Sequence, residues 1–390
     1  PMVSRSGRYT LCFNGEVYNF EALRSELGDR AGPYRGHSDT EVMLAAFEAW
    51  GIEAAVRRFQ GMFAFAVHDA VESCLWLARD RVGIKPLYVA SGPGWIVFGS
   101  ELRALLEHPR VAARGSREGA YHYLRSLYVP APHSIVEGVE KLHPGHLLRV
   151  EIGAGGVSDR TERAYWDLFE VAEAGVEGAA FDEVEALDRL HELLRSAVGM
   201  RLVADVPVGA LLSGGIDSSL VVAIASELSD RPIKTFTIRF GDPDFDEGPI
   251  AAAVGAALGT DHTEVALSPD RIEELVPETA QFSDEPMANP SLLPTLLVSR
   301  VAREQVVVAL SGDGGDELFG GYNRYRLFPP VLEKTRRFPG ALRRPIGSVA
   351  NRLAGIPAVD GLGRLALRRR LGSQHSFAAR LRRAAAILSA

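Results

Sequence analysis

The sequence has 390 residues, 46% hydrophobic and 24% charged, which is ordinary for a globular protein but too long for one core, so two domains are predicted. A net charge of −7 argues against a protein that mainly holds nucleic acid, and no uncharged apolar run approaches the roughly 18 residues of a membrane span. The only cysteines, Cys12 and Cys74, form no CxxC pair and no Cys/His cluster, so neither a disulfide framework nor a thiolate metal site is supported, and a reducing cytoplasm fits.

Residues 1–150 mix short β-rich runs with capped helices, which predicts an α+β domain. Apolar runs predict strands at residues 8–13, 61–67, 74–78 and 95–98. A helix is predicted to begin at Ser38, whose hydroxyl can cap it while Glu41 reaches back, and to end at Gly51.

Residues 151–180 are rich in Gly, Ala and Glu and predict a linker, in which Tyr165 and Trp166 dock on one of the domains. Helical spacing of apolar residues then predicts a helix over 184–198. Further strands are predicted at residues 208–212, 233–240 and 306–310, alternating with helices. Such alternation is typical of a doubly wound parallel sheet, so residues 181–390 are predicted to form an α/β domain.

The string LLSGGIDSS at residues 211–219 follows a predicted strand and opens an apolar helix. Its glycines let backbone N–H groups approach an anion, and the helix N-terminus adds partial positive charge. No Gly-Lys-Ser/Thr follows, so it is not the phosphate loop of kinases and GTPases. Asp217 beside a phosphate implies a bridging Mg²⁺. The alternative is a tight turn in which Asp217 caps the helix.

A second loop, LSGDGGDELFGGY at residues 310–322, also follows a predicted strand. Its carboxylates Asp313, Asp316 and Glu317 would repel one another unless a metal ion or a basic substrate group neutralised them. A Mg²⁺–nucleotide site shared with Asp217 accounts for both loops. A solvated acidic turn accounts for the second loop alone.

Together the two loops resemble the synthetase domain of the asparagine synthetase family, which includes β-lactam synthetase. The resemblance implies that ATP is cleaved to AMP and pyrophosphate while a carboxylate becomes an acyl-adenylate, which ammonia then attacks. It also implies that Asp217 and Asp316 bind Mg²⁺ and that Asp313 is a catalytic residue near the forming β-aspartyl adenylate. The residues implied in ATP binding are Leu211, Ser213, Gly214, Gly215, Asp217, Ser218, Ser219, Ile238, Ser311 and Gly312.

Four motifs in the first region resemble the class II glutamine amidotransferase domain in order and spacing: FNGEVYN at 13–19, GHSDTE at 36–41, GMFAF at 61–65 and ARDRVGIKPLY at 78–88. The resemblance implies an N-terminal-nucleophile hydrolase-like sandwich. It implies that Asn14 and Gly15 form the oxyanion hole that amide hydrolysis needs, and that Asn14, Glu16 and Asp39 bind glutamine. Taken alone, Asn-Gly is usually a turn, and Asp39 suits the first turn of a helix without any ligand.

The family's nucleophile is a cysteine at the mature N-terminus, and an arginine-containing motif follows it. Neither is present, and Cys12 and Cys74 lie inside strand patterns without a free α-amine, so both are interpreted as core residues. A family lysine that contacts the adenylate phosphate would lie beyond Ala390. The sequence is therefore expected to be incomplete at both ends and unable to take ammonia from glutamine by itself.

The resemblance implies a glutamine-hydrolysing asparagine synthetase whose partners are aspartate, glutamine and ATP, with a homodimer as a further expected partner. Its products would be asparagine, glutamate, AMP and pyrophosphate. One rival keeps the same chemistry on another carboxylate, in a peptide, a sugar acid or a natural-product precursor. A thiolating tRNA-modifying pyrophosphatase is disfavoured because the cysteine pairs are absent, and the intact acidic loops disfavour a catalytically inactive interaction module.

Two further features have no assigned role. The string DEP at 284–286, followed by Pro290 and Ser291, also resembles the family, and both packing and binding stay open for it. From Tyr322 to Ala390 there are fifteen Arg or Lys against only Glu333 and Asp360. For this basic segment, solvated helix faces and a phosphate-bearing or polyanionic partner both stay open.

Overall fold

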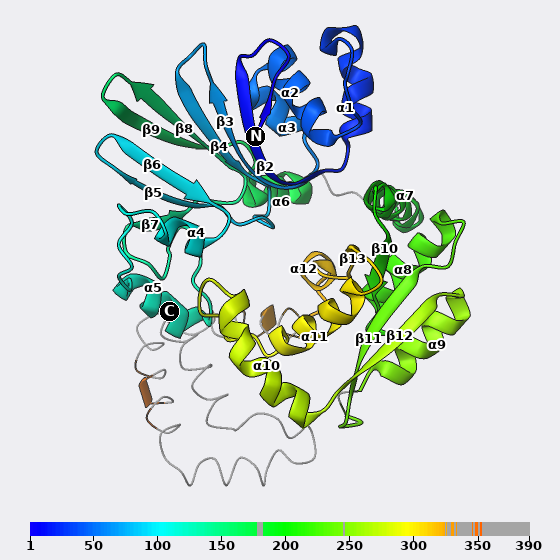
Figure 1. Ribbon diagram of the computed structural model, residues 1–390. Helices are drawn as coiled ribbons and strands as arrows, with labels where there is room; N and C mark the ends of the chain where they lie inside the picture. The colour runs from blue at the N-terminus through cyan, green and yellow to red at the C-terminus, as the bar shows by residue number, and fades with distance from the viewer. Residues whose placement is uncertain are drawn as a thin grey trace. The chain divides into compact units, whose positions relative to one another are not determined.

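The computed structural model describes residues 1–177, 182–244 and 246–323, with isolated residues between 325 and 352. The chain divides into two units, Pro1–Ser311 and Gly312–Ala390, each considered by itself (Figure 1). Most of the basic segment that begins at Tyr322 lies outside the described residues.

The N-terminal region is built on two antiparallel sheets. The larger has six strands in the order β1 (Met2–Val3), β2 (Tyr9–Val17), β3 (Gly61–Asp69), β4 (Cys74–Arg79), β8 (His146–Gly153) and β9 (Gly156–Ala164). The smaller has the order β6 (Trp95–Gly99), β5 (Tyr88–Gly92) and β7 (Val139–Lys141). The predicted strands of this region are all present.

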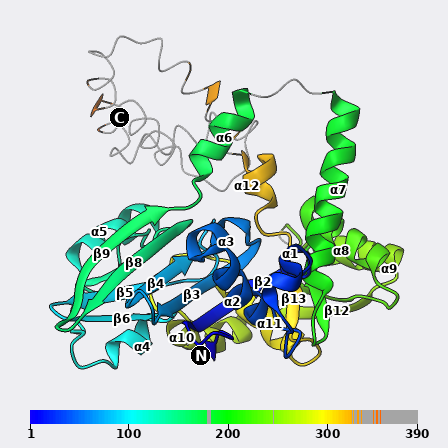
Figure 2. The ribbon, with the colours of Figure 1, turned by 90° about the horizontal axis from the view of Figure 1, so that it is seen from above.

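Alternation along β3 explains how the layers stack. Phe63 and Phe65 point to one face of the larger sheet and pack against a helical layer, whereas Ala64 and Ala66 point to the other and pack against the smaller sheet. The helical layer holds α1 (Phe20–Leu27), α2 (Asp39–Trp50) and α3 (Ile52–Arg58), which lie beside β2 and β3 in Figure 2. On the far side of the smaller sheet, α4 (Leu102–Leu106) completes an αββα sandwich. The predicted α+β fold of this region is confirmed.

The end of β8 and all of β9 lie in residues predicted from composition to be a linker. Nearly every side chain of β9 is exposed. This edge strand therefore lacks the alternation of apolar and polar residues by which a strand is predicted from sequence. Tyr165 directly follows it and is 5% exposed in the core of the N-terminal region, where Trp166 also packs. The Tyr165 hydroxyl donates to the Arg79 carbonyl at 2.9 Å, so the predicted docking of this pair is confirmed.

The C-terminal part of the first unit contains a four-stranded parallel sheet. Its order is β12 (Asp261–Leu267), β11 (Lys234–Phe240), β10 (Val208–Leu211) and β13 (Val308–Leu310). One face packs against α7 (Glu183–Leu202), α8 (Ile216–Leu228) and α9 (Gly248–Leu258), and the other against α11 (Leu292–Arg303). Helices on both faces of a parallel sheet confirm the predicted doubly wound fold.

The strand order shows where the winding of this sheet reverses. In chain order the strands run β10, β11, β12, β13, but in space the sequence is third, second, first, fourth, so the direction of winding reverses between β10 and β13. Ala210 pairs with Leu310 at the carboxyl ends of these two strands. Ligands of open α/β sheets bind at such a reversal.

The remaining elements are short or peripheral: η1 (Gly28–Ala31), α5 (Arg117–Ser126), α6 (Leu168–Glu177), α10 (Pro269–Phe282) and, in the second unit, α12 (Gly315–Phe319). Within the described part of the chain, no helix has both the length and the apolar character needed to cross a membrane.

Candidate active sites

The loop between β10 and α8 is shaped by its own serines. The hydroxyl groups of Ser213 and Ser218 lie 2.9 Å apart, and the Ser213 N–H donates to the Ser218 hydroxyl at 3.2 Å. The Gly215 N–H donates to the Ser213 hydroxyl at 3.2 Å. These three residues of the predicted phosphate loop therefore form one tight turn directly after β10.

Two observations bear on the predicted role of this loop in anion binding. Gly214 has φ +81°, and a Cβ there would lie 2.9 Å from the Ala251 backbone nitrogen, so the close approach of the loop to α9 needs glycine. The Ser219 hydroxyl is buried and lacks a hydrogen-bond partner among the described residues. Buried hydroxyls normally have a partner, and the first N–H groups of a helix have no intrahelical acceptor. The loop thus offers donors that a phosphate group would satisfy.

Asp217 lies in the first turn of α8. Its carboxylate makes no hydrogen bond or ion pair within residues 1–177, 182–244 and 246–323. The capping position of α8 is Gly215, so the alternative in which Asp217 caps the helix is not what the structure shows, although a helix N-terminus favours a nearby carboxylate even without a ligand. Mg²⁺ binding by Asp217 therefore stays a prediction.

The two residues predicted to line the adenosine site lie on neighbouring strands. Leu211 pairs with Phe236, and Ile238 follows two residues later on the same strand. Both are half-buried and pack against the cluster that contains Phe236 and Val298, on the face covered by α11. The structure thus brings Leu211 and Ile238 together beside the serine loop.

The second predicted loop begins at the neighbouring strand. Ser311 directly follows β13 and ends the first unit, and Gly312 begins the second. Within the second unit, Gly314 has φ +95° and precedes α12, whose first turn carries Asp316. The Gly321 N–H donates to the Asp316 carbonyl at 3.0 Å, which closes the loop behind this helix. The roles of Gly312, Asp313 and Asp316 stay predictions.

In the N-terminal sandwich, Asn14 and Gly15 lie side by side on β2. The Asn14 amide donates to the Ser100 hydroxyl at 2.9 Å, which fixes its orientation and leaves its second N–H for another acceptor. Gly15 has φ +146°, and a Cβ there would lie 2.0 Å from the Met62 carbonyl oxygen, so no other residue fits. An oriented amide donor suits an oxyanion hole, and the roles of Asn14 and Gly15 in one stay predictions.

The predicted glutamine-binding carboxylates lie close to each other. Burial raises the pKa of Glu16, the nearby Asp39 carboxylate raises it further, and the Lys85 ammonium group opposes both effects. Asp39 accepts the Val17 N–H at 2.9 Å and the Thr40 N–H at 2.6 Å, so it joins β2 to α2. A pair of neighbouring carboxylates favours a cation between them, which suits the α-ammonium group of an amino acid.

The ARDRVGIKPLY motif forms a loop around two buried charged side chains. Arg79 donates to the carbonyls of Gly83, Lys85 and Leu142 at 2.8, 2.9 and 2.8 Å. Asp80 is fully buried and accepts the backbone N–H groups of residues 63, 84 and 85. Together they fix the backbone that carries Lys85 toward Glu16.

Comparison with known proteins agrees with the predicted family. A family model described as "Glutamine amidotransferase domain" matches residues 1–166, and one described as "Asparagine synthase" matches residues 189–388. A Mycobacterium tuberculosis protein, described provisionally as a glutamine-hydrolysing asparagine synthetase, is 38% identical over 352 residues, which cover 89% of this chain and 52% of that protein. Asparagine synthetase [glutamine-hydrolyzing] 1 of Bacillus subtilis is 34% identical, covering 90% and 53%. "Amidase chry2" of Gibberella zeae is 29% identical, covering 93% and 54%.

The chain belongs to the asparagine synthetase family. It spans about half the length of these three relatives. The matched ranges assign the αββα sandwich to the amidotransferase domain and place the parallel sheet within the synthetase match.

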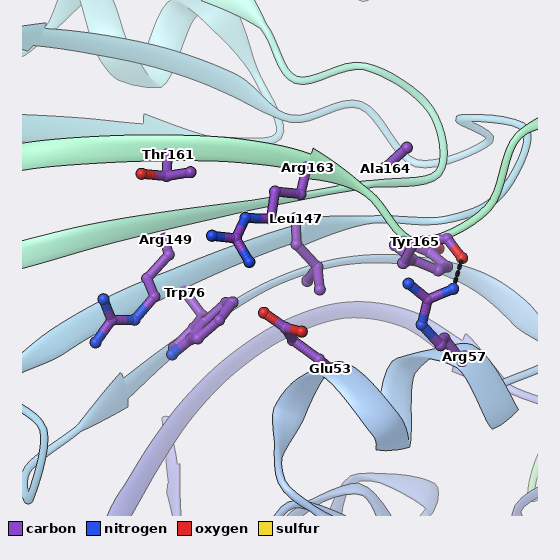
Figure 3. A pocket seen from close by; sticks show the side chains of 9 residues that line it. All are labelled: Glu53, Arg57, Trp76, Leu147, Arg149, Thr161, Arg163, Ala164 and Tyr165. Atoms are coloured by element: carbon purple, nitrogen blue, oxygen red, sulfur yellow. Dashed lines mark hydrogen bonds between the residues drawn. The ribbon is translucent and has the colours of Figure 1, made fainter.

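Two pockets occur in the amidotransferase domain. One, of about 630 Å³, is lined by the GHSDTE residues Gly36, Ser38 and Glu41 together with Met2 and Tyr34. The other, of about 390 Å³, lies between α3 and the strands β4, β8 and β9, and Figure 3 shows the side chains that line it. The lining of the second pocket includes none of the predicted site residues; its residues are Glu53, Arg57, Trp76, Leu147, Arg149, Thr161, Arg163, Ala164 and Tyr165.

Potential metal ligands also gather away from the predicted Mg²⁺ residues. Three groups of side chains have ligand atoms within 4.8 Å of one another in the described part of the chain. Asp217 belongs to none of them. The groups are Glu118, His122 and His133; His143, His146 and Glu162; and Asp69, Glu72 and Cys74.

Two contributors to the amidotransferase site carried no signal of their own in the sequence. Ser100 is a single serine after a predicted strand, and only the fold brings it to Asn14, 86 residues earlier. Lys85 lies inside the ARDRVGIKPLY motif, but its proximity to Glu16 depends on the loop that Arg79 and Asp80 build.

Proposed function

We propose that the protein amidates the side-chain carboxylate of aspartate with glutamine-derived ammonia, at the expense of ATP and through a β-aspartyl-AMP intermediate. The products are asparagine, glutamate, AMP and pyrophosphate. A cytoplasmic location is part of this proposal. The observation that supports it most is the position of the two predicted nucleotide loops, which start at the carboxyl ends of the adjacent strands β10 and β13, where the sheet reverses its winding.

The loop residues fit this chemistry. Gly214 and Gly215 let the backbone approach the departing pyrophosphate, while the Ser218 and Ser219 hydroxyls and the N-terminus of α8 supply donors. Adenosine would lie against Leu211 and Ile238. The motifs assign Asp217 and Asp316 to Mg²⁺, which would neutralise phosphate charge, and Asp313 to the neighbourhood of the forming adenylate.

In the amidotransferase domain, the same proposal gives each residue a part in amide hydrolysis. Glu16 and Asp39 hold the α-ammonium group of glutamine, because a cation stabilises the charged form of two adjacent carboxylates. The free N–H of Asn14 and the Gly15 backbone stabilise the oxyanion that forms as the amide is attacked.

A panel of carboxylic acids tests the choice of substrate. The purified protein is given ATP, Mg²⁺, an ammonium salt and one acid at a time, and pyrophosphate release is measured. We expect aspartate to give the highest kcat/KM and asparagine to form in equal amount to pyrophosphate. Glutamate, which is one methylene longer, and succinate, which lacks the amino group, are the matched controls. Higher turnover with any other acid would contradict aspartate as the acceptor.

A second candidate function keeps the reaction and changes the acceptor. It is favoured by the similarity to "Amidase chry2", whose name does not mention asparagine. The proposed roles of the two loops concern the nucleotide and the reacting carboxylate, so the loops would serve either substrate. The same panel, extended to peptide and sugar carboxylates, separates the two functions.

A further inference from the structure

The segment between α10 and α11 has no part in the proposed function, although its DEP string resembles the family. In the structure, both of its carboxylates are bound by residues of the amidotransferase domain. The segment and that domain lie in the same unit, Pro1–Ser311. These contacts therefore join two regions that carry the two proposed half-reactions.

Asp284 caps a helix of the other domain. Its carboxylate accepts the Leu102 N–H at 2.6 Å and the Arg103 Nε–H at 2.9 Å. Leu102 begins α4, and the residue at the capping position of this helix, Glu101, makes no side-chain capping bond. Asp284 thus supplies the acceptor that a helix N-terminus lacks when its own sequence provides none.

The capped helix lies next to the proposed oxyanion hole. Ser100 precedes Leu102 by two residues, and its hydroxyl accepts the Asn14 amide at 2.9 Å. A short path of hydrogen bonds and backbone therefore runs from Asp284 through the start of α4 to Asn14. Loss of the cap would free the backbone at Ser100, and with it the orientation of the Asn14 amide.

Glu285 makes the second contact and is itself well buried. Its carboxylate accepts the Ile135 N–H at 2.7 Å and pairs with the Lys141 ammonium group, whose side chain is 9% exposed. Burial lowers the pKa of Lys141, and the hydrogen bond from Glu285 opposes that shift. A buried ion pair of this kind holds its partners firmly because either charge alone would be left uncompensated.

The other end of the segment leads to the nucleotide loops. Residues 283–291 run directly into α11, which packs through Val298 and Ala302 against the cluster that includes Leu211 and Ile238. The chain then continues through β13 to Ser311. Asp284 and Glu285 are therefore the point at which the proposed adenosine site is tied to the proposed oxyanion hole.

We propose that Asp284 is a positioning residue for glutamine hydrolysis, acting through the N-terminus of α4 and Ser100 on the orientation of Asn14. Glu285 anchors the segment that presents it. This inference rests on the proposed function, because it assigns Asn14 to the glutaminase reaction. It predicts a selective defect: ammonia supply from glutamine is impaired, and synthesis from free ammonium is spared.

The test compares two nitrogen donors in the purified protein. For Asp284→Ala we expect kcat/KM for glutamine-supported pyrophosphate release to fall about 10-fold, with ammonium-supported release within about twofold of the wild type. Asp284→Asn keeps an acceptor oxygen and should lose less. The matched control is Asp270→Asn, because Asp270 is exposed on α10 and makes no hydrogen bond or ion pair in the described part of the chain.

Equal losses with both donors, or no loss with glutamine, would overturn the inference. If the wild type releases no pyrophosphate with glutamine, hydrogen exchange decides instead. The Leu102 amide should then exchange at least about 10-fold faster in Asp284→Ala than in the wild type and in Asp270→Asn, since its acceptor is gone. An unchanged rate would overturn the capping role. Absence of release with every acid and either donor would count against the proposed function alone.

Discussion

At the level of single residues, the side chain of Asp39 combines a structural role with a proposed role in binding glutamine. Asp39 suits the first turn of a helix by its sequence position, and in the structure it does accept the Thr40 N–H there. The same carboxylate also accepts the Val17 N–H and lies close enough to Glu16 to raise its pKa. A role in folding therefore does not compete with a role in binding glutamine.

Gly15→Ala should destabilise the protein even though it adds only a methyl group. The Cβ would lie 2.0 Å from the Met62 carbonyl oxygen, at a backbone φ of +146° that alanine rarely adopts. We expect the free energy of unfolding, measured in urea, to fall by about 1–3 kcal/mol. Gly115→Ala is the matched control, because its Cβ would meet open space, and it should change stability by less than about 0.5 kcal/mol. Similar effects of the two substitutions would refute the steric argument.

Glu16→Gln should change how stability depends on pH. Burial, followed by Asp39, raises the pKa of Glu16 in the folded protein above the ordinary 4.5, so the folded state holds the proton more tightly than the unfolded state. The wild type consequently loses stability as pH rises from about 4.5 through the raised pKa, and the glutamine variant is spared that loss. Unfolding free energies should be measured from pH 4 to 8. The stability of the variant relative to the wild type should rise across this window, and the difference between the two should then stay constant. Glu21→Gln, at an exposed position on α1, is the matched control, and an equal pH dependence of the two variants would contradict the argument.

At the level of elements, strands that lie in apolar runs were predictable from the sequence, and two exposed edge strands were not. The strands β10 and β11 appear as apolar runs because each lies between two neighbouring strands and packs against helices. The edge strand β13 was predictable as well, because it lies in the apolar run at residues 306–310. In contrast, β9 and β12 are edge strands, each held by one neighbour and with mostly exposed or half-buried side chains. Their position depends on backbone pairing, which leaves no apolar pattern for a sequence to show.

Among the site residues, those in a local motif were predictable and those brought together by the fold were not. The loop at 211–219 could be predicted because its residue types and their spacing are themselves the chemistry. The partners Ser100 of Asn14 and Leu102 of Asp284 are 86 and 182 positions away, and nothing local marks them. Such contacts require the tertiary fold.

Arg79→Lys should disrupt the loop that carries Lys85. The guanidinium group donates to three carbonyls at once, and the ammonium group of lysine cannot reproduce that planar fork. Because at least one buried carbonyl would lose its partner, we expect a destabilisation of about 2–3 kcal/mol in urea unfolding. Arg117→Lys, at an exposed position on α5 with no partner among the described residues, is the control and should be nearly neutral. Equal stability of both variants would show that the loop does not depend on Arg79.

For the whole molecule, the two domains use different means to place reactive groups. The amidotransferase domain fixes side chains from strands and loops with hydrogen bonds to the backbone and to another side chain. The synthetase region instead relies on topology, because the reversal between β10 and β13 brings two strand ends together whatever the sequences of the intervening helices. The sequence alone predicted a parallel sheet but not this strand order.

The position at which ATP is cleaved tests the proposed reaction. Adenylation releases pyrophosphate, whereas a kinase transfers the γ-phosphate and releases ADP. In the proposed function, the glycine backbone and serine hydroxyls of the loop at 211–219 would bind the β- and γ-phosphates, and the loop has no lysine to follow a transferred γ-phosphate. Attack on the α-phosphorus is therefore expected, with pyrophosphate leaving. With aspartate labelled by oxygen-18 in its side-chain carboxylate, plus ATP, Mg²⁺ and an ammonium salt, mass spectrometry should find one labelled oxygen in each AMP formed, since the carboxylate oxygen that bonds to phosphorus leaves with it. A reaction without aspartate is the control and should yield no labelled AMP. ADP and phosphate as products, or AMP without label, would show that the carboxylate is not activated by adenylation.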